Sequence, residues 1–237
     1  NAHFAAWQSK TSTRLKALKP GFHPKELIAE VSENLLAHYA NKPLIDKYDV
    51  YQSLMDYWAE TMQDDAYLLS VDGWKAETYR VIETKKGKDG KPGKQVDKGW
   101  ACDLIPKPLI VAAYFAKEQA ALDALNAELE STGAKLAELE EEHGGEEGLF
   151  AELDKVNKAC VAARVKEINK DKAAIKECKE ELAALNSWLK LNTAEGELKK
   201  QIKEQEAALD ALALKQYPKL SEKDIKTLVV DNKWLVE

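Results

Sequence analysis

The sequence has only three cysteines among 237 residues, and their positions favour neither a disulfide framework nor a metal site. Cys102, Cys160 and Cys178 are far apart, odd in number and free of the CxxC spacing typical of zinc ligands. Small secreted domains, in contrast, depend on dense and paired cysteines. We therefore expect a cytoplasmic protein, kept in a reducing compartment, without a disulfide scaffold or a structural zinc.

Long apolar runs and export signals are missing as well. No stretch of about 18 consecutive apolar residues is present, and the first residues lack a signal-peptide pattern. We therefore expect no membrane partner. The chain begins at Asn1 rather than at methionine, so we expect an excised piece of a longer protein, with Asn1-Ala2 left by cloning and a cut at Glu237.

The motifs of common enzyme chemistry are absent, including GxGxxG, a Walker loop, HExxH and GxSxG. The histidines have no spacing that suggests metal ligation; they are His3, His23, His38 and His143. Asp64-Asp65 could in principle bind a cation, but such a pair more often caps or ends a helix. Six glutamates form an acidic segment that a solvated turn explains: Glu138, Glu140, Glu141, Glu142, Glu146 and Glu147.

One short segment is rich in lysine, although the formal net charge of the chain is −6. An overall negative charge excludes a general electrostatic nucleic-acid binder, so DNA contact would require a local basic patch. Lysines on a loop neutralise phosphates without reading sequence. The glycines and the proline of the same segment are equally typical of an ordinary hairpin tip. The candidate phosphate contacts are Lys85, Lys86, Lys88, Lys91, Lys94 and Lys98.

Residues 3–108 predict an aromatic-rich globular base made of helices and a small β hairpin or meander. Pro24 is placed where the first helical residue needs no N–H, and apolar residues then recur at helical spacing up to Tyr39. A second amphipathic pattern covers 49–62. The β-rich runs AYLLSV and ETYRVIE flank Asp72-Gly73, and GWACDLI follows, so we expect the strands within about 66–105.

Residues 109–216 predict a long antiparallel α-helical hairpin of the coiled-coil type. A stripe within 109–141 has intervals that alternate between three and four from Leu122 onward, which is the period of a coiled-coil seam; its members are Phe115, Leu122, Leu125, Leu129, Thr132, Leu136 and Leu139. A second helix is expected from about 172 to 216, although Asn192 and Gly196 weaken its middle. Residues 142–170 would fold over at the tip, with Asn157 or Lys170-Asp171 where a short helix ends and a long one begins.

The last segment, 217–237, predicts a short helix that docks back. Ser221 and Asp224 form a capping-box-like start after Tyr217-Pro218. Ile225, Leu228 and Val229 then give one apolar face. We expect Asp231-Asn232 to turn the chain, so that Trp234 and Leu235 fold back onto the base.

Four long phrases of the sequence carry a resemblance to a known family. They are WQSKTSTRLKALKPGFHPKELIAEVSENLLAHY (7–39), DVYQSLMDYWAETMQDDAYLL (49–69), GWACDLIPKPLIVAAYF (99–115) and SEKDIKTLVVDNKWL (221–235). Together they resemble the C-terminal region of the methyltransferase (M) subunit of type I restriction–modification systems. The resemblance runs from about His3 to Leu235 and is weakest in the stretch rich in Ala, Leu, Glu and Lys.

The resemblance implies a parent protein that is an S-adenosylmethionine-dependent adenine-N6 DNA methyltransferase, assembled with a specificity subunit and a restriction subunit. In that family the catalytic domain carries a glycine-containing cofactor loop and an Asn-Pro-Pro-aromatic motif, which holds a flipped adenine. This sequence contains neither motif, and none of its seven prolines follows another. We therefore expect no catalytic or cofactor-binding residue here, and no activity of this piece alone.

Three functions follow as hypotheses from these observations. The first is a non-catalytic C-terminal part of such a subunit, which serves assembly with the specificity subunit and positioning on DNA. The second is a stand-alone coiled-coil scaffold or adaptor, which explains the leucine stripes but not the aromatic-rich first seventy residues. The third is an independent DNA-binding module, which rests on the lysine-rich segment alone.

Overall fold

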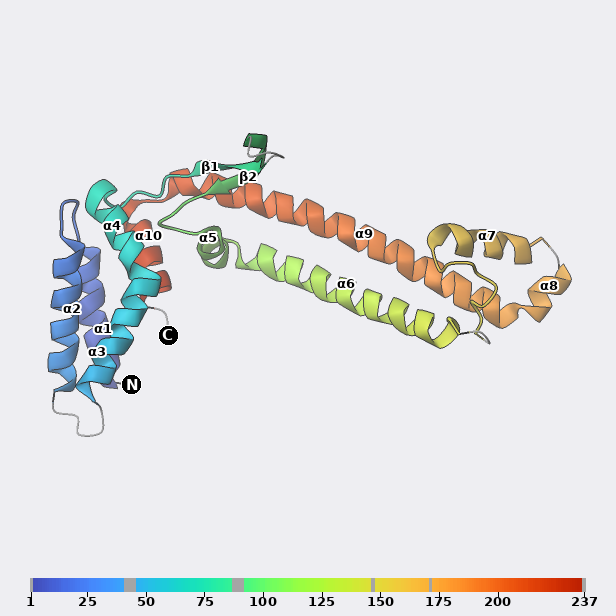
Figure 1. Ribbon diagram of the computed structural model, residues 1–237, viewed down its shortest axis with the longest axis horizontal. Helices are drawn as coiled ribbons and strands as arrows, with labels where there is room; N and C mark the ends of the chain where they lie inside the picture. The colour runs from blue at the N-terminus through green and yellow to red at the C-terminus, as the bar shows by residue number, and fades with distance from the viewer. Residues whose placement is uncertain (1, 41–45, 87–91, 146–147, 171, 236–237) are drawn as a thin grey trace. The chain divides into compact units, whose positions relative to one another are not determined.

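The computed structural model describes residues 2–40, 46–86, 92–145, 148–170 and 172–235 (Figure 1). These residues are mostly helical and include one small antiparallel sheet of two strands, as the sequence predicts in outline. Their contacts group them into two compact units. Unit 1 comprises residues 1–116 and 211–237, and unit 2 comprises residues 117–210. None of the helices described is both long enough and apolar enough to cross a bilayer.

The first two helices of unit 1 are α1 (Ala2–Lys16) and α2 (Pro24–Tyr39). The predicted start of α2 at Pro24 is confirmed, because the residue occupies the first turn, where a missing N–H costs nothing. Leu27, Val31 and Leu35 form the buried stripe of α2. The connection before it passes through Gly21, whose φ of 87° is unfavourable for other residues.

The next helical stretch extends further than the sequence predicts. It comprises α3 (Lys47–Tyr57), the π-helix η1 (Trp58–Met62) and α4 (Gln63–Asp72). The predicted strand at 66–71 is therefore wrong. Continuing the helix places Asp65, Ala66 and Leu69 on one buried face, and this burial outweighs the local β-propensity of AYLLSV. Gly73 ends α4 with a φ of 72° instead of forming a hairpin turn.

The sheet is a two-stranded hairpin of β1 (Tyr79–Lys86) and β2 (Pro92–Ala101), in which Thr84 pairs with Gln95. Of the two predicted alternatives the hairpin is confirmed and the meander is wrong, because GWACDLI adds no third strand and β2 ends at Ala101. The residues after it leave the sheet and bury Cys102, Leu104 and Ile105 in the core of unit 1. Pro106 then occupies the position before α5 (Lys107–Tyr114).

The C-terminal residues of the chain complete the core of unit 1. They form η3 (Tyr217–Lys219), α10 (Glu222–Lys226) and the π-helix η4 (Thr227–Trp234). The predicted capping box between Ser221 and Asp224 is confirmed. The predicted turn at Asp231-Asn232 is wrong, since η4 continues through both residues. Helical continuation, rather than a fold-back, buries Trp234 completely.

A buried carboxylate connects these separated segments. Asp65 is 4% exposed, and its two oxygens accept hydrogen bonds from Lys233 Nζ and from Trp234 Nε1, each at 2.8 Å. Lys233 Nζ also donates to the carbonyl of Leu104 at 3.1 Å. Burial raises the pKa of the Asp65 carboxyl, although both donors act in the opposite direction. Asp64 and Asp65 lie in the first turn of α4, which continues directly from η1, so the prediction that the pair caps or ends a helix is wrong.

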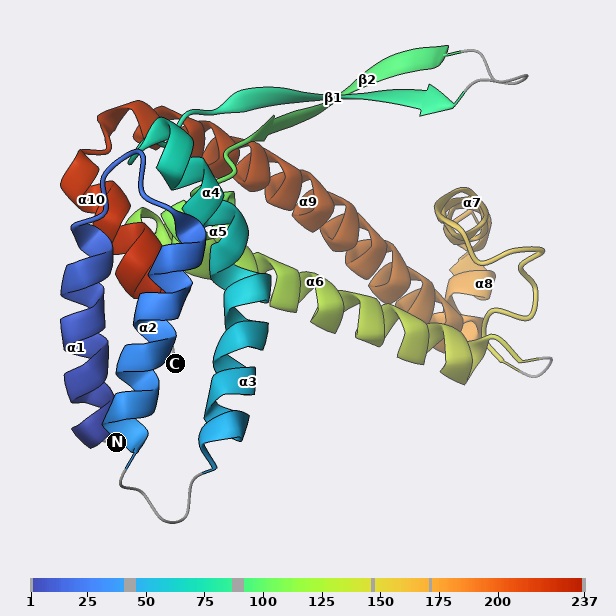
Figure 2. The same cartoon turned by 60° about the vertical axis from the view of Figure 1, so that its left-hand side comes forward.

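Unit 2 contains α7 (Lys158–Ile168), α8 (Lys172–Glu177) and most of α6 (Ala116–His143) and α9 (Lys179–Gln216), of which Ala116 and residues 211–216 are assigned to unit 1. The two long helices, α6 and α9, run side by side in opposite directions (Figures 1 and 2). The single helix predicted at 172–216 is interrupted at Cys178, but it is continuous across Asn192 and Gly196. Likewise, Phe115 interrupts the helix predicted at 109–141, and its φ of −130° separates α5 from α6.

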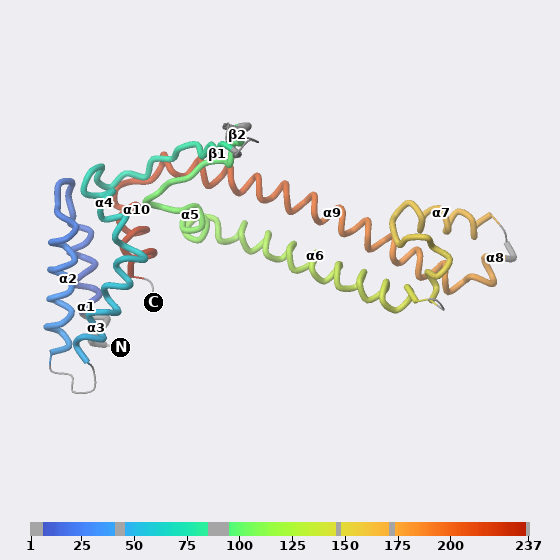
Figure 3. Tube along the Cα trace, in the orientation of Figure 1, coloured from blue at the N-terminus to red at the C-terminus, as the bar shows by residue number. Residues whose placement is uncertain are grey.

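The short helix α7 lies beside the first turns of α9 (Figure 3), where Arg164 forms an ion pair with Glu181 at 2.7 Å. Asn157 begins α7 by accepting hydrogen bonds from the N–H groups of Ala159 and Cys160. The alternative in which Asn157 ends a short helix is therefore wrong. The side chain of this residue satisfies two of the N–H groups that every helix leaves without a partner at its start.

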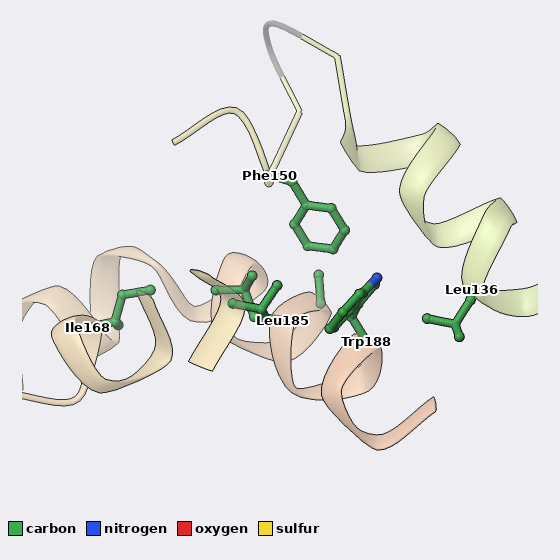
Figure 4. Close-up of a cluster of buried hydrophobic side chains, with 7 residues drawn as sticks. Leu136, Phe150, Ile168, Leu185 and Trp188 are labelled. Carbon is green, nitrogen blue, oxygen red and sulfur yellow. The ribbon is translucent and has the colours of Figure 1, made fainter. Parts of the chain in front are cut away.

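A buried apolar cluster holds this end of unit 2 together (Figure 4), and we call it the tip cluster. It consists of Leu136, Phe150, Val161, Ile168, Ala184, Leu185 and Trp188. Trp188 is 3% exposed, and its Nε1 donates to Glu140 Oε1 at 2.8 Å. Glu140 thus has a structural partner, whereas the sequence alone suggests only a solvated acidic turn.

Removal of the Asp65 carboxylate should destabilise unit 1. Asp65→Ala leaves the Lys233 ammonium without its carboxylate partner and the Trp234 N–H without this acceptor, and we expect a decrease of about 3 kcal/mol in the free energy of unfolding. Urea unfolding followed by tryptophan fluorescence measures it. The neighbouring exposed Asp64 is the matched control, and Asp64→Ala should change stability by less than about 0.5 kcal/mol. Equal effects of the two substitutions would contradict this role of Asp65.

Trp188→Ala should loosen the tip cluster without affecting unit 1. Truncation of a fully buried tryptophan costs about 3–5 kcal/mol, because a large cavity remains. Hydrogen exchange followed by mass spectrometry should show reduced protection in peptides from 149–170 and unchanged protection in peptides from 7–39. Lys190→Ala, on the exposed side of α9, is the control that should change neither. Reduced protection in both units would show that they unfold together.

Candidate functional site

The lysine-rich segment includes residues at the end of β1 and at the start of β2, and residues 87–91 between them lie outside the described residues. Lys85 and Lys86 belong to β1 and Lys94 to β2, but the positions of their side chains lie outside the described part of the structure. Lys88 and Lys91 lie outside the described residues altogether. Lys98 is described, and its Nζ forms an exposed ion pair with Glu83 at 3.1 Å. DNA contact by these six lysines therefore stays a prediction.

Ion pairs neutralise the described base of this hairpin. Asp97 accepts a hydrogen bond from the Gly99 N–H at 2.8 Å and pairs with Arg80 across the two strands. These interactions, the backbone one first, lower the pKa of the Asp97 carboxyl. Lys98 and Arg80 each have a carboxylate partner, so any surplus positive charge of the hairpin must come from the lysines nearer its end.

A second candidate site is an apolar groove in unit 1, with a volume of about 530 Å³. One face each of α1, α2 and α3 forms its walls, and we call it the helical groove. Its floor includes Met62, Trp234 and Leu235. The wall residues are Trp7, Thr11, Leu15, Val31, Leu35, Tyr39, Asp49, Val50, Ser53, Leu54 and Tyr57.

Helical spacing places these side chains on the groove. Trp7, Thr11 and Leu15 recur at intervals of four on α1, so they share one face of that helix. On α3, Val50, Leu54 and Tyr57 recur at intervals of four and three, which also places them on one face. Each wall is therefore the apolar stripe of an amphipathic helix, and part of that stripe lines an open groove instead of a closed core.

Two long-range hydrogen bonds fix the floor of the helical groove. The Tyr57 hydroxyl donates to the carbonyl of Trp234 at 2.7 Å, and Gln8 Nε2 donates to the carbonyl of Leu235 at 2.7 Å. Burial raises the pKa of the Tyr57 hydroxyl, so it stays a neutral donor at physiological pH. These bonds hold the end of η4 between α1 and α3.

The sequence pattern does not predict the helical groove, although it identifies part of its lining. The stripes Val31–Leu35–Tyr39 and Leu54–Trp58–Met62 indicate buried helix faces, but apolar periodicity does not distinguish a closed core from an open groove. The stripe Trp7–Thr11–Leu15 is a further signal in the sequence. Its interval of four indicates a helix face that includes a large aromatic residue.

The chemistry that the helical groove offers is apolar binding. Asp49 is the only charged residue among those that line it. Among the residues that the structure describes, no group of three or more His, Cys, Asp or Glu side chains is arranged to hold a metal ion. An apolar side chain that enters the groove would gain about 25 cal/mol for each Å² removed from water.

Comparisons with known proteins give no further indication of function. No family model, no curated protein and no solved structure matches this chain. The function must therefore be inferred from its own residues and geometry.

Replacement of the lysines near the end of the hairpin tests the predicted DNA contact. The variant with Lys85, Lys86, Lys88, Lys91 and Lys94 changed to Ala should bind a fluorescent DNA duplex more weakly, as measured by anisotropy. The slope of log K against log salt should become shallower by about 0.9 for each phosphate that the variant no longer neutralises. Lys98→Ala should have less effect, because Lys98 is paired with Glu83.

A control with the same change in charge separates local binding from net charge. It replaces five exposed lysines elsewhere with Ala: Lys179, Lys190, Lys203, Lys215 and Lys219. Equal weakening by both sets, or unchanged affinity of the hairpin variant, would exclude the hairpin as a phosphate-binding site.

Proposed function

We propose that this chain is the non-catalytic C-terminal part of the methyltransferase subunit of a type I restriction–modification system. In the cytoplasm it would assemble with the specificity subunit, and through that complex with the restriction subunit and DNA. The parent enzyme would use S-adenosylmethionine to methylate adenine at N6. This part of it would carry the packing surfaces rather than the chemistry.

The observation that carries the proposal is that the four phrases of the resemblance fold into a single unit. All four, 7–39, 49–69, 99–115 and 221–235, belong to unit 1. The fourth contacts each of the others, through Gln8 with Leu235, Asp65 with Trp234, and Leu104 with Lys233. When segments that are far apart along the chain together specify one structural core, we expect them to contact one another in the folded protein.

The finer architecture belongs to the same proposal. Unit 1 would be an aromatic-rich base, since Trp58, Trp74 and Trp234 are buried within it. The α6–α9 pair of unit 2 would be a coiled-coil hairpin, with its leucine stripes at the seam and the tip cluster closing one end. Long amphipathic helices of this kind supply packing surfaces for other subunits.

The helical groove is the surface that best suits assembly with the specificity subunit. Its apolar lining and helical walls match the recognition mode in which an amphipathic helix places its apolar face in a groove. We propose that one helix of the specificity subunit occupies it. The partner in this proposal comes from the family resemblance, and the groove supplies the contact surface.

A stand-alone coiled-coil scaffold is the second candidate, and one observation favours it. Unit 2 has a buried cluster of its own, so it does not depend on unit 1 for a core. The scaffold hypothesis predicts that partners bind unit 2 and that changes in the helical groove have no effect on binding. The gene also discriminates between the two, because an upstream reading frame that encodes an Asn-Pro-Pro-aromatic motif would exclude a stand-alone scaffold.

Substitution in the helical groove tests the assembly role. The full chain should retain the specificity subunit of its own system in a pull-down, and Val50→Asp should reduce the retained amount at least about tenfold, since it places a charge on an apolar wall. The adjacent Tyr51→Asp is the control, because Tyr51 is exposed and does not line the groove. Circular dichroism checks that both variants remain helical.

The outcomes separate the two parts of this proposal. No retention of the specificity subunit by the unmodified chain would contradict the assembly function itself. Retention that Val50→Asp and Tyr51→Asp leave equally strong would preserve the assembly function but place its surface outside the helical groove.

A further inference from the structure

Helix α4 has apolar residues on two of its faces, and only one of these two faces is buried. Asp65, Ala66 and Leu69 face the core of unit 1. Tyr67 and Val71, four residues apart, lie on another face and are 47% and 76% exposed. A helix that only covers a core presents polar residues to solvent, so an exposed apolar strip on a short helix indicates a surface for contact.

This exposed strip lines a groove that continues past the end of α4. Two adjoining hollows in the surface of unit 1 share Leu68, Asp72 and Asp103 as lining residues. The first extends along α4 to Glu60 and Lys233, and the second extends to Tyr79 at the start of β1. The Tyr79 hydroxyl donates to the Asp103 carboxylate and joins the strand to this wall. We call the combined hollow the α4 groove.

Carboxylates dominate the polar rim of the α4 groove. Its lining includes five of them besides Asp65: Glu60, Asp64, Asp72, Glu77 and Asp103. The two lining lysines are Lys75 and Lys233, and Asp65 already pairs with Lys233. Among the described residues, no salt bridge neutralises any of the five carboxylates. Their summed charge gives the groove a negative potential.

We propose that the α4 groove binds a basic amphipathic segment of a partner protein. In this complex, apolar residues of the segment cover Tyr67, Leu68 and Val71. Lysine or arginine residues on its flanks approach Asp64, Asp72 and Asp103. The assignment rests on charge complementarity around an apolar strip. Such complementarity selects a partner by attracting basic segments and repelling acidic ones, more than by the area that is buried. It holds whether or not the chain belongs to a methyltransferase subunit.

Charge also argues against the other occupants of this surface. Nucleic acid and anionic lipid would bring phosphates against the five carboxylates. A second copy of the chain has a formal charge of −6, and its most basic segment, TKKGKDGKPGK at 84–94, has no residue large and apolar enough to cover Val71. A segment that alternates basic and apolar residues at helical spacing would match both the apolar strip and the carboxylate rim of the α4 groove.

The experiment uses a synthetic fluorescent peptide with leucines on one helical face and lysines on its flanks. The full chain should bind it, as measured by anisotropy. A peptide with glutamate in place of lysine, and one with the same composition in scrambled order, should each bind at least about tenfold more weakly. Asp64→Asn combined with Asp72→Asn should weaken binding of the lysine peptide, and Val71→Ser alone should do so without loss of helicity, because Val71 is mostly exposed.

Matched variants distinguish the groove from net charge and general stickiness. Glu33→Gln combined with Glu206→Gln removes the same charge at exposed sites elsewhere, and Leu212→Ser removes another exposed apolar side chain. Both should leave affinity unchanged. Equal weakening by the groove and control variants would overturn the proposal, as would equal binding of the scrambled peptide. Sedimentation that shows a dimer abolished by Val71→Ser would overturn it in favour of self-association.

Discussion

The structure of unit 1 depends on the burial of one carboxylate. A carboxylate removed from water must be given hydrogen-bond donors, or its desolvation opposes folding. Asp65 receives two donors, and both come from the last residues of η4. Lys233 in turn reaches the carbonyl of Leu104, which fixes the segment between β2 and α5. Three stretches that are distant in sequence thus share one polar contact, and the Trp74 ring packs beside the Trp234 ring that takes part in it.

The same contact explains why the sequence alone is misleading at this position. Asp65 and Lys233 are separated by 168 positions, so no local pattern indicates that they meet. Without that partner, Asp64-Asp65 looks like a helix end and AYLLSV looks like a strand. Burial of Asp65 and Leu69 on one side of α4 favours the helix over the strand in this segment. That burial depends on elements that come later in the chain.

Features encoded by neighbouring residues could be predicted. Pro24 at the start of α2 and the Ser221–Asp224 capping box follow from backbone rules that involve only a few residues. The helical groove and the α4 groove could not be predicted in this way, because each is the space left where helices with apolar faces do not close on one another. Periodicity identifies an apolar face, but only the arrangement of neighbouring helices shows whether it is covered.

The division of the chain has a consequence for how such a protein can change over time. Unit 1 is discontinuous in sequence, and the chain leaves it near Ala116 and returns to it near Ala211. Unit 2 therefore has the sequence organisation of an inserted domain, and evolution tolerates insertions where the host unit keeps its own core. Paired additions or deletions of whole helical turns in α6 and α9 would alter the length of unit 2 while every residue around Asp65 stays in place. Such changes in length would leave the sequence of unit 1 unaltered.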